Sequence, residues 1–273
     1  MKKRFFGVIA AALLATSVPI VRAAPTILYT TDFNSAGNHT GDFASSASYT
    51  DGAIIGQDSW LITGTSVVNP INVANTATNG NVSLNTNGQD VNRIFTPVVN
   101  SGSVFLSADI NVTTPAATGD YFIHLDDGTS SGFFDRVFVK AATGGFVMAV
   151  GTSSGATPTY GTTVLTTGTT YHIVAEYDFV GGGTTNDTAS LFVNPTDPII
   201  GGDNLYVAGT TQGTDGSQIT GVNLRQGAAA SAPTVTVDNI IVATVAPVPE
   251  PTSIAFAAMA VFGLVGVRRR KSV

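Results

Sequence analysis

Apolar and polar positions alternate with a period of two along the middle of the chain. In SVFLSADINVT, residues 103–113, every second side chain is apolar or small, namely Val104, Leu106, Ala108, Ile110 and Val112. The segment TTYHIVAEYDF, residues 169–179, repeats the pattern with Tyr171, Ile173, Ala175 and Tyr177. Successive side chains of a strand point to opposite faces, so this spacing predicts strands with one face in a core and the other toward solvent.

Further short alternating segments predict an all-β fold. They are separated by turn residues such as Asp127-Gly128. No long window in this region has the apolar spacing of an amphipathic helix. We therefore expect an antiparallel two-sheet sandwich, which buries one face of every strand. The additional predicted strands lie within residues 119–127, 133–140, 144–151, 188–194, 217–226 and 233–245.

Two of these segments resemble paired strands of concanavalin-like and laminin-G-like jelly rolls. They are YHIVAEYD, residues 171–178, and ASLFVN, residues 189–194. In those folds a strand of the type W-x-H-V-x-x-x-Y-D precedes a hairpin that ends L-Y-V-N-G. This chain has Tyr171 in place of the tryptophan and Pro195 in place of the glycine. The resemblance implies that the two segments pair within one sheet.

The start of the chain, residues 1–23, predicts a secretory signal peptide. Cations at residues 2–4 precede an apolar stretch at residues 5–18, and Ala23 completes the small-residue pattern that signal peptidase reads. We expect cleavage after Ala23. The protein is therefore expected to be exported.

The end of the chain, residues 247–273, predicts a short membrane anchor. The run from Ser253 to Val267 has no charge, and as a helix it would span roughly 22 Å at ~1.5 Å per residue, against a hydrocarbon core near ~30 Å. We expect a single C-terminal transmembrane helix whose cations, from Arg268 to Lys271, stay in the cytoplasm by the positive-inside bias. The middle of the chain then lies outside the cell.

These parts of the tail resemble the PEP-CTERM sorting signal of Gram-negative bacteria. The resemblance implies cleavage near the Pro-Glu-Pro motif by an exosortase, a membrane transpeptidase-like enzyme of organisms that make exopolysaccharide. The implied partners are exosortase, signal peptidase and the membrane. The expected organisation is a signal peptide at 1–23, a concanavalin-like sandwich at 24–246 and the sorting signal at 247–273. The matching residues are Val248, Pro249, Glu250, Pro251, Arg268, Arg269 and Arg270.

The exported region is strongly acidic. Residues 24–247 contain four cations, Arg93, Arg136, Lys140 and Arg225, against sixteen aspartates and one glutamate, a net charge of −13. Such a surface repels nucleic-acid phosphates, so nucleic-acid binding is excluded. The chain has no cysteine, which excludes thiolate nucleophiles and zinc–thiolate sites.

The sequence contains no recognisable catalytic set. Glycosidases need two carboxyl groups at one sugar bond, and the ExDxxE motif of concanavalin-like glucanases is absent, because the only glutamates are Glu176 and Glu250. Asp126 and Asp127 could supply an acid and a base, although Asp127 also begins a hairpin-turn sequence. The three histidines lack the spacing of zinc ligands. We assign no catalytic residue and expect a protein that is not an enzyme.

One structural calcium ion is the best site hypothesis from the sequence. The segments around Asp32 and Asp238 resemble the first and last strands of jelly-roll modules, which commonly lie side by side. Ca²⁺ prefers carboxylate and carbonyl oxygens, so Asp32 and Asp238 would be the side-chain ligands. The alternative is that each carboxylate accepts hydrogen bonds from backbone amides where the termini meet. The lone Trp60 is expected in the core rather than on a sugar-binding surface.

These features predict an exported protein of the cell envelope or extracellular matrix. Its expected role is structural or carbohydrate-binding and non-catalytic, as in a biofilm matrix, with polysaccharide as the ligand. A polysaccharide-active hydrolase or lyase that uses Asp126 or Asp127 is one alternative. The other is an ice-binding surface, suggested by the Thr-rich residues 157–170 and by the type of tail.

Overall fold

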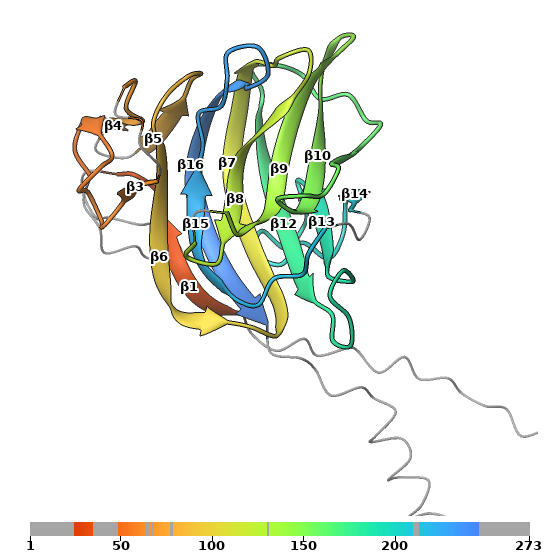
Figure 1. The fold of residues 1–273 in the computed structure, drawn as a ribbon. Coiled ribbons are helices and arrows are strands. Elements are labelled where there is room, and N and C mark those ends of the chain that lie inside the picture. The colour runs from red at the N-terminus through yellow and green to blue at the C-terminus, as the bar shows by residue number, and fades with distance from the viewer. Residues whose placement is uncertain are drawn as a thin grey trace, which may run out of the picture.

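Two antiparallel sheets lie face to face in the protein (Figure 1). The computed structural model describes residues 25–34, 49–63, 66, 68–76, 79–129, 131–209 and 213–245, and this part of the chain contains strands and no helix. The predicted all-β two-sheet sandwich is confirmed. The nine-stranded sheet contains, in spatial order, β14 (Leu205–Ala208), β13 (Thr188–Val193), β12 (Thr170–Phe179), β7 (Gly102–Thr114), β16 (Thr234–Val245), β5 (Asn79–Leu84), β4 (Asn72–Thr76) and β2 (Gly52–Ala53), with β1 (Thr26–Thr31) also paired to β16. The seven-stranded sheet contains β11 (Thr159–Tyr160), β10 (Gly145–Ser153), β9 (Phe133–Ala142), β8 (Asp120–Asp126), β15 (Ile219–Leu224), β6 (Asp90–Val99) and β3 (Leu61–Thr63).

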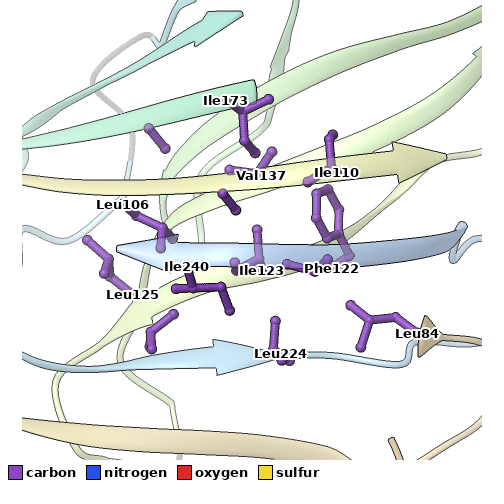
Figure 2. Packing of buried hydrophobic residues seen from close by; sticks show 14 of the residues in the cluster. Leu84, Leu106, Ile110, Phe122, Ile123, Leu125, Val137, Ile173, Leu224 and Ile240 are labelled. Atoms are coloured by element: carbon purple, nitrogen blue, oxygen red, sulfur yellow. The ribbon is translucent and has the colours of Figure 1, made fainter. Parts of the chain in front are cut away.

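The core between the sheets is formed by the alternating apolar positions. The register pairs Ile173 of β12 with Ala108 of β7 and Ala175 with Leu106, so the predicted inner positions of both strands share one face. Complete burial of an aliphatic side chain contributes about 1.5–3 kcal/mol, which makes this layer the main source of stability. Figure 2 shows its members from both sheets, including Leu106, Ile110, Ile123, Val137 and Leu224.

Trp60 belongs to this core, as the sequence predicted. It is fully buried, and its Nε1 donates a hydrogen bond to Oη of Tyr49 at 3.1 Å. The indole also packs against Tyr29, with 6.1 Å between ring centroids and near-perpendicular planes. Trp60 therefore stabilises the interior and offers no surface for a sugar ring.

Two predicted strand pairings are confirmed. Strand β1 pairs antiparallel with β16, with Thr31 opposite Ile240, so the first and last strands of the described sandwich lie side by side. Strands β12 and β13 pair as the sequence resemblance implied, with Tyr177 opposite Ala189. Because β16 also pairs with β5 and β7, it joins three neighbours in one sheet.

The outer side of the nine-stranded sheet differs from the simple alternating pattern. Phe105 and Val174 point away from the main core, yet both are fully buried. They pack against Phe192 and against Ile199 and Ile200 of the segment between β13 and β14. Alternation alone placed Phe105 toward solvent, and the prediction failed because this apolar segment covers the sheet.

A carboxyl group without a hydrogen-bond partner lies in the interior. Asp135 of β9 has a φ of 48°, is fully buried, and has no hydrogen bond to either Oδ1 or Oδ2. Burial, with added repulsion from Glu176 and Asp178, raises the pKa of Asp135 well above its usual value. Such a group keeps its proton at neutral pH, because a lone buried carboxylate is costly. The unfolded chain, by contrast, ionises this residue.

Asp135→Asn is therefore expected to raise the free energy of unfolding at pH 7, because it removes the ionisation that favours the unfolded chain. A raised folded-state pKa means that stability falls as pH rises above the unfolded pKa of about 3.9, since only the unfolded chain releases the proton. Asparagine does not ionise, and it tolerates positive φ. Thermal unfolding of the full chain at pH 3 and pH 7 measures the effect. A gain at pH 7 that disappears at pH 3 is expected, and an equal change at both values would rule out the ionisation account.

Candidate functional site

The outward side of the seven-stranded sheet carries a cluster of cationic and aromatic side chains, which we call the basic face. The register places Arg136 opposite Gly151 and Tyr121 opposite Phe138. These residues point away from the core because the intervening Val137 points into it. The basic face comprises Tyr121 and His124 of β8, Arg136, Phe138 and Lys140 of β9, Tyr160 of β11, and Arg225 directly after β15.

Tyr121 lies between two guanidinium groups. Its ring centroid is 4.2 Å from Cζ of Arg225 and 5.2 Å from Cζ of Arg136. Further along β9, Nζ of Lys140 lies 4.1 Å from the ring centroid of Tyr160. Cation–π contacts are worth about 0.5–2 kcal/mol each, so these long side chains are held in position rather than free in solvent.

The two arginines differ in how their charge is balanced. Arg225 pairs with carboxylates, since its Nη1 is 2.9 Å from Oδ2 of Asp120 and its Nε is 3.9 Å from Oδ2 of Asp90. Arg136 donates through Nη2 to the backbone oxygens of Ser153 and Ala156, and its buried Nε has no partner. Among the described residues, no carboxylate pairs with Arg136. Its positive charge is therefore not neutralised locally.

His124 lies at the centre of the face and is uncharged. Burial, together with the charges of Arg136 and Arg225, lowers its pKa to about 3. Its Nδ1 lies 3.0 Å from the backbone oxygen of Leu125 and donates to it, and its ring packs 4.7 Å from that of Phe133. A neutral imidazole in this setting can accept a hydrogen bond at Nε2 but adds no charge to the face.

A cavity of about 160 Å³ lies on the same side of the sheet. Burial raises the pKa of Asp126 and of Asp90, and both line this cavity. Oδ1 of Asp126 accepts a hydrogen bond from N of Gly128 at 2.7 Å, and its Oδ2 accepts one from Nδ2 of Asn223. Two carboxyl groups that hold protons more tightly than usual therefore share one cavity. The complete lining is Thr63, Asp90, Asn92, Asp126, Thr129, Phe133 and Asn223.

Asp127 stabilises the loop between β8 and β9. Its Oδ1 accepts hydrogen bonds from N and Oγ1 of Thr129 at 2.8 and 2.6 Å. This is the pattern of an Asx turn, in which a side chain caps the backbone two residues on. The sequence left open whether Asp127 acts as an acid or base or stabilises a turn. Its hydrogen bonds to Thr129 are those of a turn residue.

The two predicted calcium ligands, Asp32 and Asp238, lie in one acidic cluster with Asp109. Burial raises the pKa of Asp238 to about 7, and the charges of Asp109 and Asp32 contribute. Asp32 accepts hydrogen bonds from Asn34, at Oδ1 from N at 3.1 Å and at Oδ2 from Nδ2 at 2.8 Å. Within the described ranges, no group of three or more histidines and carboxylates is arranged to hold a metal ion. Calcium binding at Asp32 and Asp238 stays a prediction.

His172 ties this cluster to the segment that covers the nine-stranded sheet. Its Nδ1 is 2.6 Å from Oδ1 of Asp109 and its Nε2 is 2.7 Å from the backbone oxygen of Pro198. Burial lowers the pKa of His172, but its bonds to Asp109 and Pro198 outweigh burial and raise the pKa above its usual value. Both ring nitrogens face acceptors, so the imidazolium form fits this site. His172 therefore links Asp109 of β7 to the segment that contains Pro198.

The predicted signal peptide and sorting residues, including Pro249, Glu250 and Pro251, lie outside the described residues. The described part of the chain contains no helix that is long and apolar enough to cross a membrane. The C-terminal transmembrane helix at residues 253–267 stays a prediction.

The fold and the basic face define a β-sandwich protein with one polar, aromatic-rich sheet surface. Residues 247–271 match the family model described as the PEP-CTERM protein-sorting motif. The resemblance of Val248 to Pro251 and of the cations Arg268 to Arg270 to this motif is thereby confirmed. The motif implies export, membrane-associated sorting and processing by exosortase.

Solved structures with a similar fold include carbohydrate-active proteins. A mutant of the alginate lyase Aly36B in complex with alginate tetrasaccharide is 14% identical with a TM-score of 0.50, covering 80% of this chain and 97% of that chain. Domain 4 of AbnA, a GH43 extracellular arabinanase from Geobacillus stearothermophilus, in complex with arabinotriose, is 15% identical with a TM-score of 0.45, covering 84% and 96%. The carbohydrate-binding module CBM66 from Bacillus subtilis is 12% identical with a TM-score of 0.39, covering 66% and 92%. At these identities the likeness shows the fold alone. No curated protein matches the chain.

The sequence analysis counted the cations of the basic face individually and did not predict that they lie together. Arg136 and Lys140 are an even number of positions apart in β9, so strand parity alone could have placed them on one side. Arg225 joins them because β15 lies beside β8, which is beside β9. That arrangement is not visible in local sequence, so the cluster was missed.

Asp238→Asn is expected to raise the melting temperature above pH 7 and to leave it unchanged near pH 3. The folded-state pKa of about 7 exceeds the unfolded value, so ionisation of Asp238 costs stability as pH rises from about 4 toward 7. Thermal unfolding of the full chain across this range measures the effect.

Millimolar Ca²⁺ tests the metal prediction in the same assay. A rise in melting temperature that Asp238→Asn abolishes supports the calcium site, and an unchanged wild-type value counts against it.

Deleting Arg268 to Lys271 is expected to impair sorting without unfolding the sandwich, because these cations fix the orientation of the tail. Fractionation of the native host, followed by immunoblotting for the processed form, measures the effect. The matched control replaces Arg268, Arg269 and Arg270 by lysine, which keeps the charge and should keep sorting. Normal processing of the truncated chain would show that the basic end has no such role.

Proposed function

We propose that the sandwich is a non-catalytic polysaccharide-binding domain, which its sorting tail delivers to the cell surface or extracellular matrix of a Gram-negative bacterium that makes exopolysaccharide. The observation that carries this proposal is the basic face. There the rings of Tyr121 and Tyr160 lie beside positioned cations on a sheet surface. Sugar sites combine aromatic surface for the ring with a few convergent polar groups, and this face supplies both.

The neighbouring polar groups fit the same role. Asn92 and Asn223 line the cavity on this side of the sheet, and their amides can donate to and accept from sugar hydroxyl groups. The other sheet offers no comparable surface near Phe105 and Val174, because an apolar segment covers it. The fold likeness to a lyase structure that contains an alginate tetrasaccharide supports a sugar ligand by analogy only.

A polysaccharide hydrolase or lyase is the second candidate function. The observation that favours it is the cavity shared by Asp90 and Asp126, whose raised pKa values suit proton transfer. Asp127, the other carboxylate that the sequence suggested, accepts a hydrogen bond from the Thr129 amide within its own loop. Turnover of a polysaccharide that Asp126→Asn abolishes would favour the enzyme over the binding domain.

The ice-binding alternative has less support. Residues 157–170 contain only β11, which is two residues long, and the first residue of β12. An ice-binding surface built on this segment would need a longer regular row of threonines. Thermal hysteresis of the purified protein remains the direct test.

The binding proposal predicts that the full chain, purified in detergent, binds polysaccharide on a glycan array, and that Tyr160→Ala weakens this binding about 3- to 10-fold. An aromatic contact is worth about 0.5–1.5 kcal/mol, which corresponds to this range. The control is Thr236→Ala on the outer side of the nine-stranded sheet, which should bind as the wild type does. Absence of binding to every polysaccharide tested would reject the proposal.

A further inference from the structure

The charges of the exported region are divided unevenly between the basic face and the rest. Three of the four cations in residues 24–247, Arg136, Lys140 and Arg225, lie on this face. Three carboxylates contact or line it, Asp90 and Asp120 beside Arg225 and Asp126 in the cavity. The net charge of −13 therefore comes entirely from the remainder, where one cation stands against fourteen carboxylates. An anionic polymer would be repelled everywhere except at this face.

The face also holds a guanidinium group that forms no ion pair with a carboxylate among the described residues. The guanidinium of Arg136 has backbone carbonyl partners, a buried Nε without a partner, and a residue exposure of only 7%. It lies over the same ring, that of Tyr121, as the guanidinium of Arg225. The two like charges on this ring repel each other. Burial lowers the pKa of Arg136, and the positive charge of Arg225 also lowers it. An anion above the ring would relieve this repulsion.

The positions of the cations suit a polymer rather than a single small anion. Lys140 lies on β9 and Arg225 follows β15, and β8 lies between these two strands. Two strand spacings separate β9 from β15 by about 10 Å, so the two cations are carried by different strands of the sheet. A chain that crosses the strands would pass Tyr160 with Lys140 first and then Tyr121 with Arg225. It would meet an aromatic ring and a cation at each of two points.

We propose that the basic face binds a carboxylate-bearing polysaccharide, a polymer of uronic acids. Lys140 and Arg225 contact the carboxylates, Arg136 supports them with its charge from below, and Tyr121 and Tyr160 contact the sugar rings. This inference rests on the proposed polysaccharide-binding function and adds the chemical class of the ligand. The half-buried Asn92, which lines the neighbouring cavity, can form hydrogen bonds with hydroxyl groups.

The test compares two ligands with the same sugar backbone, polygalacturonate and its highly methyl-esterified form, in which a methyl ester replaces most of the charged carboxylates. The full chain is expected to bind the free acid at least about tenfold more tightly, and added salt should weaken this binding. Lys140→Gln is expected to remove most of the difference, and Lys140→Arg should restore it. Melting temperatures of both variants should lie within a few degrees of the wild type, since at most one cation–π contact is lost.

Arg93→Gln is the matched control because it removes the one remaining cation of the region. Arg93 pairs with Asp58 at 3.3 Å near Tyr29, away from the basic face. Equal loss of binding in Arg93→Gln and Lys140→Gln would mean that total charge decides, which overturns the inference. Equal binding of the acid and the ester would overturn it too while leaving the proposed function intact. Binding to no polysaccharide, charged or neutral, would overturn both.

Discussion

The shared core between the two sheets is the constraint on which the rest of the structure depends. Every long strand must give one of its two side-chain rows to this layer, so strand parity decides which residues face outward. The apolar row of β9, with Val137 and Val139, lies in the core. Arg136, Phe138 and Lys140 are therefore placed outside together. The side chains of the basic face therefore alternate, along the same strands, with the side chains that form the core.

The two outward sides of the sandwich serve different purposes. On the nine-stranded sheet, the apolar segment with Ile199 and Ile200 packs over Phe105 and forms a second small core. His172 holds this segment by its hydrogen bond to the Pro198 carbonyl, so the segment is fixed by a polar contact as well as by burial. On the seven-stranded sheet, cations and aromatic rings occupy the outward row of β9. The proposed ligand surface follows from this asymmetry.

Local sequence predicted what depends on periodicity and missed what depends on neighbours. The alternating rows of β7 and β12 were predicted because strand parity is local. The pairing of β1 with β16 joins distant segments, and it was predicted from the resemblance to jelly-roll modules. The burial of Phe105 was not, since it depends on a segment almost a hundred residues further on. Asp135 likewise gives no local sign that it enters the core at positive φ. The basic face required the order β9, β8, β15, which only the assembled sheet reveals.

The sorting tail and the basic face do not compete for one site. The tail follows β16 of the nine-stranded sheet, whereas the basic face lies on the seven-stranded sheet. Strand β16 ends at Val245, opposite Ser103 in the nine-stranded sheet, and the matched sorting motif begins at residue 247. The Pro-Glu-Pro residues begin four positions after Val245, a distance of at most about 14 Å along an extended chain, so we expect processing near the end of β16. The basic face lies on the other sheet. A chain held by its C-terminal end can therefore be processed at one sheet and bind a polymer at the other.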